Sequence, residues 1–145
     1  MTGELLEHVL GSLSPQGSQN LSSLYEFSQA SYGDVWAAGL SNKGFVYVPN
    51  ACMEIECKVH VLFHGCFGSF EINGFTFMTE IGVNDYAESN EFIVIYPQIT
   101  AHSNNPEGCW DFWGYTGDDF MIQSALQISI VHKMAQNPPI VNWNN

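Results

Sequence analysis

The sequence predicts an α/β fold built on a parallel sheet, within a single domain of 145 residues. Residues 57–63 and 91–96 are nearly continuous apolar runs, which is typical of buried parallel strands. Between them, residues 70–81 carry apolar side chains at the spacing of a helix face. A strand, a helix and a strand within about 40 residues predict a right-handed βαβ unit with a parallel pair of strands.

Residues 1–43 are predicted to form a helix and an irregular lead-in. Thr2 is placed as the N-cap of a short helix that ends at Gly11, because one face of this segment is apolar. The following stretch, to Asn20, is rich in Ser, Gly, Gln and Pro and is typical of a loop. Residues 24–27 alternate between apolar and polar side chains, the pattern of a short strand.

Residues 44–136 are predicted to form the core. They start with a strand at 44–49 and end with a helix over 117–136, which Pro138 and Pro139 follow. Asp118 and Asp119 suit the positive N-terminal end of that helix. Its predicted buried stripe consists of Ile122, Ala125, Leu126, Ser129 and Ile130.

The charge of the chain restricts its partners. The formal net charge is -12, from 15 acidic and 3 basic residues, the latter all lysines. Phosphate recognition depends on Lys and Arg, so we expect neither nucleic acid nor an anionic membrane as a partner. No apolar run approaches the ~20 residues of a membrane span. We also expect no cofactor and no metal site.

The four cysteines favour two disulfides. Cys52 and Cys57 flank a short acidic turn, while Cys66 and Cys109 each lie in a loop after a strand, so Cys52–Cys57 and Cys66–Cys109 are the favoured pairs. One alternative is four reduced thiols. The other is a zinc site of Cys66, Cys109 and a histidine, for which the spacing is a weak match.

The turn His64-Gly65-Cys66 follows the central predicted strand. Loops at the carboxyl ends of parallel strands carry the chemistry of open α/β folds. We therefore interpret the turn as part of an oxyanion hole, in which the backbone N–H of Cys66 faces a substrate oxygen and His64 and Gly65 position the loop. His60 lies about 13 Å from His64 along a strand, too far to share a metal ion, and is interpreted as a histidine of the core or sheet face.

The segment 109–115 is unusually aromatic. It is interpreted as an apolar lip for a hydrophobic ester or polymer, with Trp110, Trp113 and Tyr115 as substrate-binding residues. The alternative is that Trp110 and Phe112 only cap the core. Asp111 is expected to hold the loop or cap a turn.

No nucleophile accompanies these elements. The chain has no Gly-x-Ser-x-Gly motif, and Ser12 and Ser14 follow a predicted helix, whereas a nucleophile elbow joins a strand to a helix. We therefore assign no catalytic side chain.

Together these segments resemble the polyhydroxybutyrate depolymerases, which are α/β-hydrolase esterases. The resemblance rests on residues 44–52, 57–66, 82–90, 92–98 and 105–115, together with Gln127. Phe67, Gly68, Tyr86 and Phe112 depart from the residues common in that family.

The resemblance implies a Ser-His-Asp triad that cleaves poly(3-hydroxybutyrate) through an acyl-enzyme. It implies that Cys66 contributes its N–H to the oxyanion hole. No triad motif has a matching position here, so the chain resembles only the C-terminal half of the circularly permuted fungal-type members. The implied fold is a partial α/β-hydrolase fold without its nucleophile half, inactive alone.

Two hypotheses follow. In the first, the chain is the oxyanion-hole half of such an esterase, and the missing N-terminal half or a dimer mate covers an open sheet edge. In the second, it is a non-catalytic binding or structural module derived from that fold. Paired cysteines and the resemblance suggest secretion, although the first residues do not resemble a signal peptide.

Overall fold

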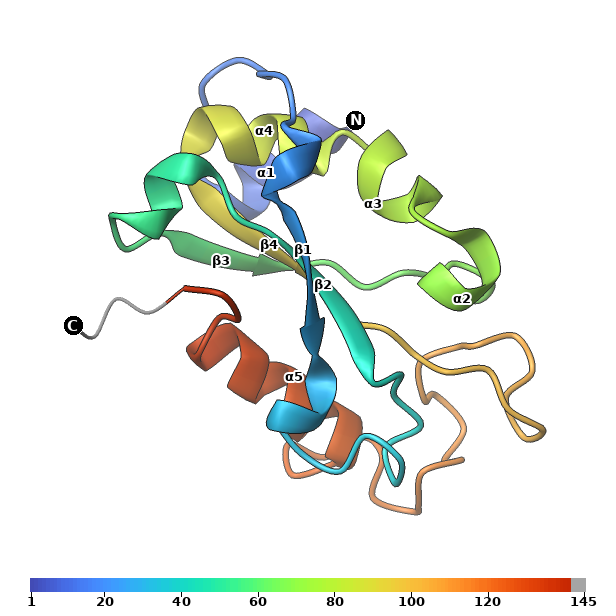
Figure 1. Cartoon of the computed structure of the whole chain (residues 1–145). Helices are drawn as coiled ribbons and strands as arrows, with labels where there is room; N and C mark the ends of the chain where they lie inside the picture. The colour runs from blue at the N-terminus through green and yellow to red at the C-terminus, as the bar shows by residue number, and fades with distance from the viewer. Residues whose placement is uncertain (142–145) are drawn as a thin grey trace.

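The computed structural model describes residues 1–141 and contains one four-stranded sheet (Figure 1). The strand order across the sheet is β1-β2-β4-β3. The strands are β1 (Leu24–Ser28), β2 (Lys43–Tyr47), β3 (Lys58–Val61) and β4 (Phe92–Tyr96).

The sheet is mixed, so the predicted parallel sheet is wrong in part. β3 and β4 pair in parallel, as the βαβ pattern predicted, with His60 opposite Val94. β2 runs antiparallel to both of its neighbours, β1 and β4. The apolar run at β2 shows that this strand is buried on both faces, but burial carries no information about strand direction.

Five α-helices accompany the sheet among the described residues. They are α1 (Thr2–Leu10), α2 (Phe70–Asn73), α3 (Thr76–Glu80), α4 (Val83–Asn90) and α5 (Leu126–Gln136). Short 3₁₀ turns lie at Leu21–Ser23, Gln29–Ser31 and Asn50–Met53. The connection from β3 to β4 therefore holds three helices.

Two helix predictions need correction. The helix predicted over 70–81 is divided at Gly74, which ends α2 with a φ of 60°, a conformation that favours glycine. The helix predicted from Gly117 begins only at Leu126, because Ala125 has extended backbone and the preceding residues form turns. Asp118 and Asp119 consequently lie outside α5, and its buried residues are Gln127, Ile130, Val131 and Met134.

The two faces of the sheet each support an apolar core. On one face, Val46, Ile93 and Ile95 pack with α5 residues that include Ile130 and Met134. On the other face, residues of β2 and β4 pack under the remaining helices; this group comprises Phe45, Tyr47, Phe92, Val94, Tyr96, Leu6, Met78, Val83 and Ala87. Alternate residues of β2 and β4 thus serve opposite cores, as strand geometry requires.

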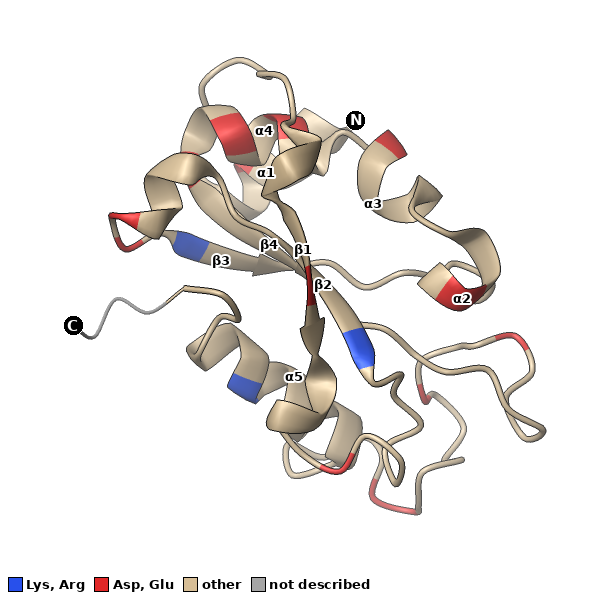
Figure 2. Cartoon of the chain, in the orientation of Figure 1, with Lys and Arg blue, Asp and Glu red and all other residues tan. Residues whose placement is uncertain are grey.

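Acidic side chains are spread over helices, loops and strand β1, whereas the three lysines lie one each on β2, β3 and α5 (Figure 2). Across residues 1–141 no helix has the length and apolar character needed to cross a membrane.

Candidate oxyanion-hole and aromatic-loop site

The predicted oxyanion turn begins at His64, three residues after β3 ends at Val61. The Gly68 N–H donates to the Gly65 carbonyl at 3.0 Å, which closes a tight turn with Cys66 and Phe67 at its corners. Phe67 has a φ of 62°, the left-handed conformation that a type II turn requires at this corner and that usually selects glycine. The Phe67 N–H donates to the Glu107 carbonyl at 2.7 Å, so the turn is fastened to the loop after β4.

His64 fixes the start of this turn. Its Nδ1 lies 2.8 Å from the Gly65 carbonyl, and its Nε2 lies 3.4 Å from the Ile99 N–H, so a neutral ring with its proton on Nδ1 serves both contacts. Burial lowers the pKa of His64, and the Gly65 contact opposes this shift only in part. Both ring nitrogens face backbone groups, which leaves neither directed at a nucleophile.

The corner of the turn leaves donors open. Among the described residues, no group accepts the backbone N–H of Cys66. A Cβ placed on Gly65 would meet no atom within 4 Å, so the space beside this residue is unfilled. The turn therefore leaves the Cys66 N–H unpaired at an exposed corner, where it is free to donate to a substrate oxygen.

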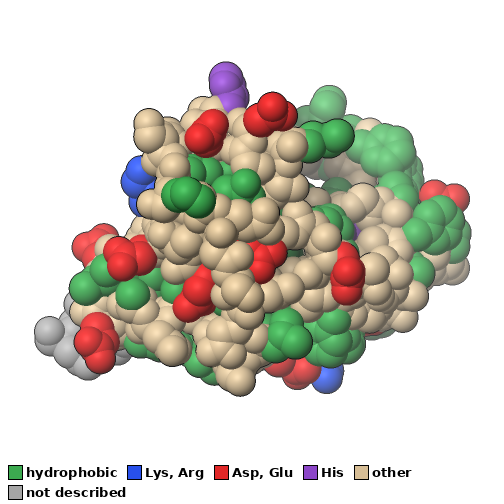
Figure 3. Space-filling model, turned by 90° about the horizontal axis from the view of Figure 1, so that it is seen from above, with side chains coloured by type: hydrophobic (Ala, Val, Ile, Leu, Met, Phe, Trp, Pro, Cys, Tyr) green, Lys and Arg blue, Asp and Glu red, His purple; other side chains and the backbone are tan. Residues whose placement is uncertain are grey.

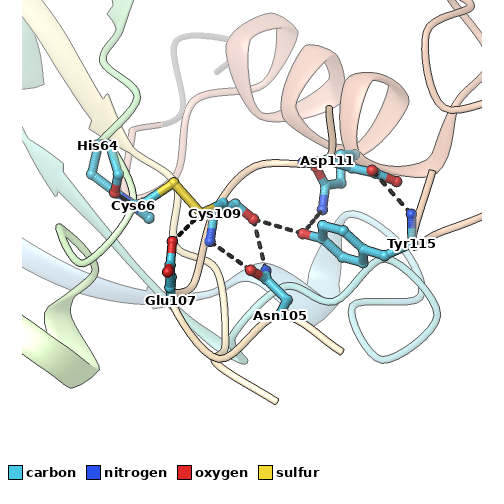
Figure 4. The surroundings of a disulfide bond; sticks show 9 residues. His64, Cys66, Asn105, Glu107, Cys109, Asp111 and Tyr115 are labelled. Atoms are coloured by element: carbon cyan, nitrogen blue, oxygen red, sulfur yellow. Dashed lines mark hydrogen bonds between the residues drawn. A yellow bond between two sulfur atoms is a disulfide. The ribbon is translucent and has the colours of Figure 1, made fainter. Parts of the chain in front are cut away.

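A disulfide joins the turn to the loop after β4 (Figure 4). Cys66 and Cys109 are bonded, with their Cα atoms 4.3 Å apart. Asn105 holds Cys109 from both sides: its Oδ1 accepts the Cys109 N–H at 2.9 Å and its Nδ2 donates to the Cys109 carbonyl at 2.8 Å. The second favoured disulfide, Cys52–Cys57, is also present.

Glu107 lies close to the Cys66 and Cys109 sulfur atoms, and the three ligand atoms fall within 4.8 Å of one another. Both sulfurs are bonded to each other, so this cluster offers no thiolate. The alternative zinc site that uses the two cysteines is therefore incompatible with the structure.

Asp111 organises the aromatic loop, as the sequence predicted. Its Oδ1 accepts the N–H groups of Trp113, Gly114 and Tyr115, and its Oδ2 accepts both the N–H and the hydroxyl of Thr116. Burial by itself raises the pKa of Asp111, but the hydrogen bonds from Thr116, Gly114 and Tyr115 outweigh it and lower the pKa below its usual value. Both oxygens of the carboxylate thus accept hydrogen bonds from the loop.

The aromatic side chains divide between core and surface. Trp110 packs against the core and against the rings of Phe63 and His64, at centroid distances of 4.8 and 5.7 Å. Phe112 is 70% exposed and Trp113 is 45% exposed, and their rings are in contact. The alternative that Phe112 caps the core is therefore wrong, whereas Trp110 does cap it. Figure 3 shows hydrophobic side chains gathered around a hollow at the end of the molecule where α2 and α3 lie.

Tyr115 is half-buried rather than directed at solvent. Its hydroxyl donates to the Cys109 carbonyl at 2.8 Å and accepts a hydrogen bond from Gln127 Nε2 at 2.7 Å. Burial raises the pKa of Tyr115. Gln127 Oε1 also accepts the Asp111 N–H at 2.9 Å, so α5 holds the aromatic loop through one side chain.

Asn105 and Gln127 are the site residues to which the sequence assigned no role. Both are buried polar side chains. Their partners are backbone groups and, for Gln127, the Tyr115 hydroxyl, all distant in the sequence or in a loop without periodicity. His60, in contrast, is half-buried on β3 as predicted, and its Nε2 has no hydrogen-bond partner among the described residues.

Comparisons with known proteins identify relatives of this chain. No family model matches. The chain is 36% identical to the polyhydroxybutyrate depolymerase of Talaromyces funiculosus over 144 aligned residues. The alignment covers 89% of this chain and 42% of the relative. It is 29% identical over 139 residues to the poly(3-hydroxybutyrate) depolymerase of Delftia acidovorans, covering 92% and 27% respectively.

Two solved structures agree with these relatives. The crystal structure of PHB depolymerase from Penicillium funiculosum aligns with a TM-score of 0.82 at 30% identity, over 90% of this chain and 45% of that one. A PHB depolymerase complexed with R3HB trimer aligns with a TM-score of 0.83, also at 30% identity and over the same shares of the two chains. This chain therefore spans less than half the length of the relatives that it matches, and the predicted resemblance is confirmed.

Proposed function

We propose that this chain, which is related to the polyhydroxybutyrate depolymerases, forms the oxyanion-hole part of an ester hydrolase that acts on an aliphatic polyester. The nucleophile and its base are proposed to lie in the remainder of the site, outside these 145 residues. This corresponds to the C-terminal half of a circularly permuted α/β-hydrolase. The relatives' additional length supports the division, since the chain matches only 42% and 27% of the two curated proteins.

The unpaired N–H of Cys66 is the observation that carries the proposal. When a hydroxyl attacks an ester carbonyl, negative charge develops on the carbonyl oxygen. A preorganised N–H donor at that position stabilises the tetrahedral intermediate, and loss of one such donor costs about 10²–10³ in kcat. His64, the Cys66–Cys109 disulfide and the Glu107 carbonyl hold the turn in place before substrate arrives.

The aromatic loop is proposed to contact the polymer. Trp113 and Phe112 offer exposed ring surface, Tyr115 packs against Trp113, and Trp110 packs against His64 of the turn. A polyester chain has an apolar backbone and neutral carbonyl groups, which such a surface suits. The acidic chain, with a net charge of -12, disfavours anionic polymers.

A complementation assay tests the catalytic part of the proposal. The chain is mixed with the portion of the Talaromyces funiculosus depolymerase that it does not match, and hydrolysis of p-nitrophenyl butyrate is followed. Neither part alone is expected to hydrolyse the ester, whereas the mixture is. Activity of the isolated chain would show that it contains its own nucleophile and would refute the division of the site.

Two substitutions at Cys66 isolate the N–H donor. Cys66→Ala removes the disulfide but keeps the N–H, and Cys66→Pro removes both, while proline is favoured at this corner of a type II turn. The proline variant is expected to be about 100-fold less active in the mixture than the alanine variant. Equal activities would show that the Cys66 N–H is not an oxyanion donor.

A binding module is the second candidate, favoured by the exposure of Phe112 and Trp113. In that case the isolated chain adsorbs to a poly(3-hydroxybutyrate) film, Trp113→Ala weakens adsorption, and no mixture yields hydrolysis. Adsorption and complementation together distinguish the two functions.

The outer edge of β3 is proposed to pair with the nucleophile-bearing part. β3 ends the sheet, and only its β4 side is paired among the described residues. The isolated chain is expected to self-associate in sedimentation, and the complementary part should dissolve these assemblies. A clean monomer that binds no dye for exposed apolar surface would contradict this.

Two disulfides also support a proposal of secretion, since such bonds persist in oxidising compartments.

A further inference from the structure

One asparagine of this chain stands in the acceptor motif for N-linked glycosylation. In Asn20-Leu21-Ser22, a residue other than proline separates the asparagine from a side-chain hydroxyl. No other asparagine among the 145 residues is followed in this way by Ser or Thr. Such a short motif also arises by chance, so its surroundings must show that a glycan can be attached. The motif lies in the 3₁₀ turn Leu21–Ser23, directly before β1.

Asn20 uses all of its polar groups except the side-chain nitrogen. Its backbone N–H donates to the Tyr47 hydroxyl at 2.7 Å, its carbonyl accepts the Ser23 N–H at 2.8 Å, and its Oδ1 accepts the Ser22 N–H at 3.1 Å. Nδ2 has no hydrogen-bond partner among the described residues. Because the carboxamide is planar, the bond to Oδ1 also fixes the direction of Nδ2. The nitrogen that would bear the sugar is therefore both free and oriented.

The serine of the motif is also unengaged. Its N–H closes an Asx turn onto Asn20, a conformation that brings the third residue of the motif back toward the carboxamide. Ser22 is exposed, and its Oγ has no hydrogen-bond partner within residues 1–141. The hydroxyl on which recognition of the motif depends is thus available to a transferase.

The surface around this turn has room for a bulky group. Asn20, Leu21 and Ser22 are all exposed. A groove of about 430 Å³, lined in part by Gln19 and Leu21, borders the turn. A glycan is bulky and projects from the surface, so the folded chain accommodates one here without displacing a packed side chain.

The motif lies at the end of the sheet opposite to the oxyanion turn. β1 and β4 each pair antiparallel with β2, so β1 runs in the same direction as β4 and its parallel neighbour β3. Asn20 precedes β1, whereas the oxyanion turn that begins at His64 follows β3. A glycan on Asn20 would consequently leave the oxyanion turn uncovered.

We propose that Asn20 is an N-glycosylation site of this chain in a eukaryotic secretory pathway. The proposal rests on the proposed secretion, which the two disulfides support, and does not depend on ester hydrolysis. In the transfer, Nδ2 attacks the anomeric carbon of a lipid-pyrophosphate-linked oligosaccharide. The N–C bond forms while the bond from that carbon to the pyrophosphate oxygen breaks. Nδ2 loses one proton, and the lipid pyrophosphate leaves with the bonding electron pair.

Secretion of the chain from a eukaryotic host, behind a cleavable leader, tests the proposal. The secreted wild type is expected to migrate faster on a denaturing gel after treatment with a peptide N-glycosidase. This enzyme leaves an aspartate at the glycosylated position, which peptide mass spectrometry locates. Asn20→Asp keeps the Oδ1 acceptor but lacks the amide nitrogen, and Ser22→Ala keeps the N–H donor but lacks the hydroxyl. Both variants are expected to lose the glycosylated form completely, whereas Ser22→Thr retains it.

Asn42→Asp makes the same substitution at an exposed asparagine outside the motif, and as the matched control it should keep the glycan. A secreted wild type without a glycan, or a glycan that persists in Asn20→Asp, would overturn the proposal. If a variant is retained in the host, the position that mass spectrometry finds in the wild type decides the result. Failed complementation would refute the catalytic proposal alone, because transfer to Asn20 needs no ester hydrolysis.

Discussion

The Cys66–Cys109 disulfide is expected to stabilise this chain about twice as strongly as Cys52–Cys57. A disulfide restricts the unfolded chain, and the effect grows with the logarithm of the loop that it closes. The two loops differ widely, with sequence separations of 43 and 5. The loop-closure relation at 25 °C then gives about 4 kcal/mol for Cys66–Cys109 and about 2 kcal/mol for Cys52–Cys57.

Urea unfolding of two double variants, each with and without dithiothreitol, measures the two contributions separately. Cys52→Ala/Cys57→Ala retains only Cys66–Cys109, and Cys66→Ala/Cys109→Ala retains only Cys52–Cys57. Reduction changes no side-chain packing at the substituted positions, so the loss of free energy of unfolding belongs to the remaining disulfide. We expect losses of about 4 and about 2 kcal/mol.

The comparison between the two variants tests whether loop length sets the contribution of each disulfide. Equal losses, or a larger loss for the Cys52–Cys57 bond, would refute the argument that loop length sets the contribution. A loss of about 4 kcal/mol is large for a chain of 145 residues, because stabilities of roughly 7–20 kcal/mol are typical at this size.

Three further outcomes are expected. Phe67→Gly should be about 1 kcal/mol more stable to urea than Phe67→Ala, because only the alanine keeps a Cβ at a φ of 62°; the opposite order would contradict this. Gln29→Leu should lower the free energy of unfolding by about 3 kcal/mol, since it leaves the buried Ser41 carbonyl and Gln98 N–H unpaired, whereas the exposed Gln123→Leu should have little effect. Asp111 has a lowered pKa in the folded chain, so the stability that its carboxylate contributes is full above the ordinary pKa of 3.8 and is lost as the pH falls through the lower folded value. The difference in free energy of unfolding between wild type and Asp111→Ala should therefore narrow on acidification. A constant difference would show that the carboxylate charge is unimportant.

Local signals in the sequence predicted most strands and the disulfide pairs. The apolar runs at β2, β3 and β4 mark buried strands, and cysteines placed after neighbouring parallel strands lie at one edge of the sheet. The direction of β2 was not predictable in this way, because side-chain burial is the same in a parallel and an antiparallel strand.

Tertiary contacts decided the features that the sequence missed. The apolar spacing over 70–81 continues through Gly74, so periodicity alone gave one helix where backbone conformation gives two. Gln127 is one polar residue in an amphipathic helix, and only the approach of residue 38 and Tyr115 reveals its partners. The outward position of Phe112 likewise depends on the turn that Asp111 fixes.

The central strand β4 has a kinetic consequence. All five of its residues are buried, its side chains alternate between the two apolar cores, and strands flank it on both edges. Neither core can melt without exposing a face of this strand, so the two layers are expected to open as one cooperative unit. The amide protons of β4 should then exchange with solvent only through global unfolding, and their exchange rates would report the stability of the whole sheet without any denaturant.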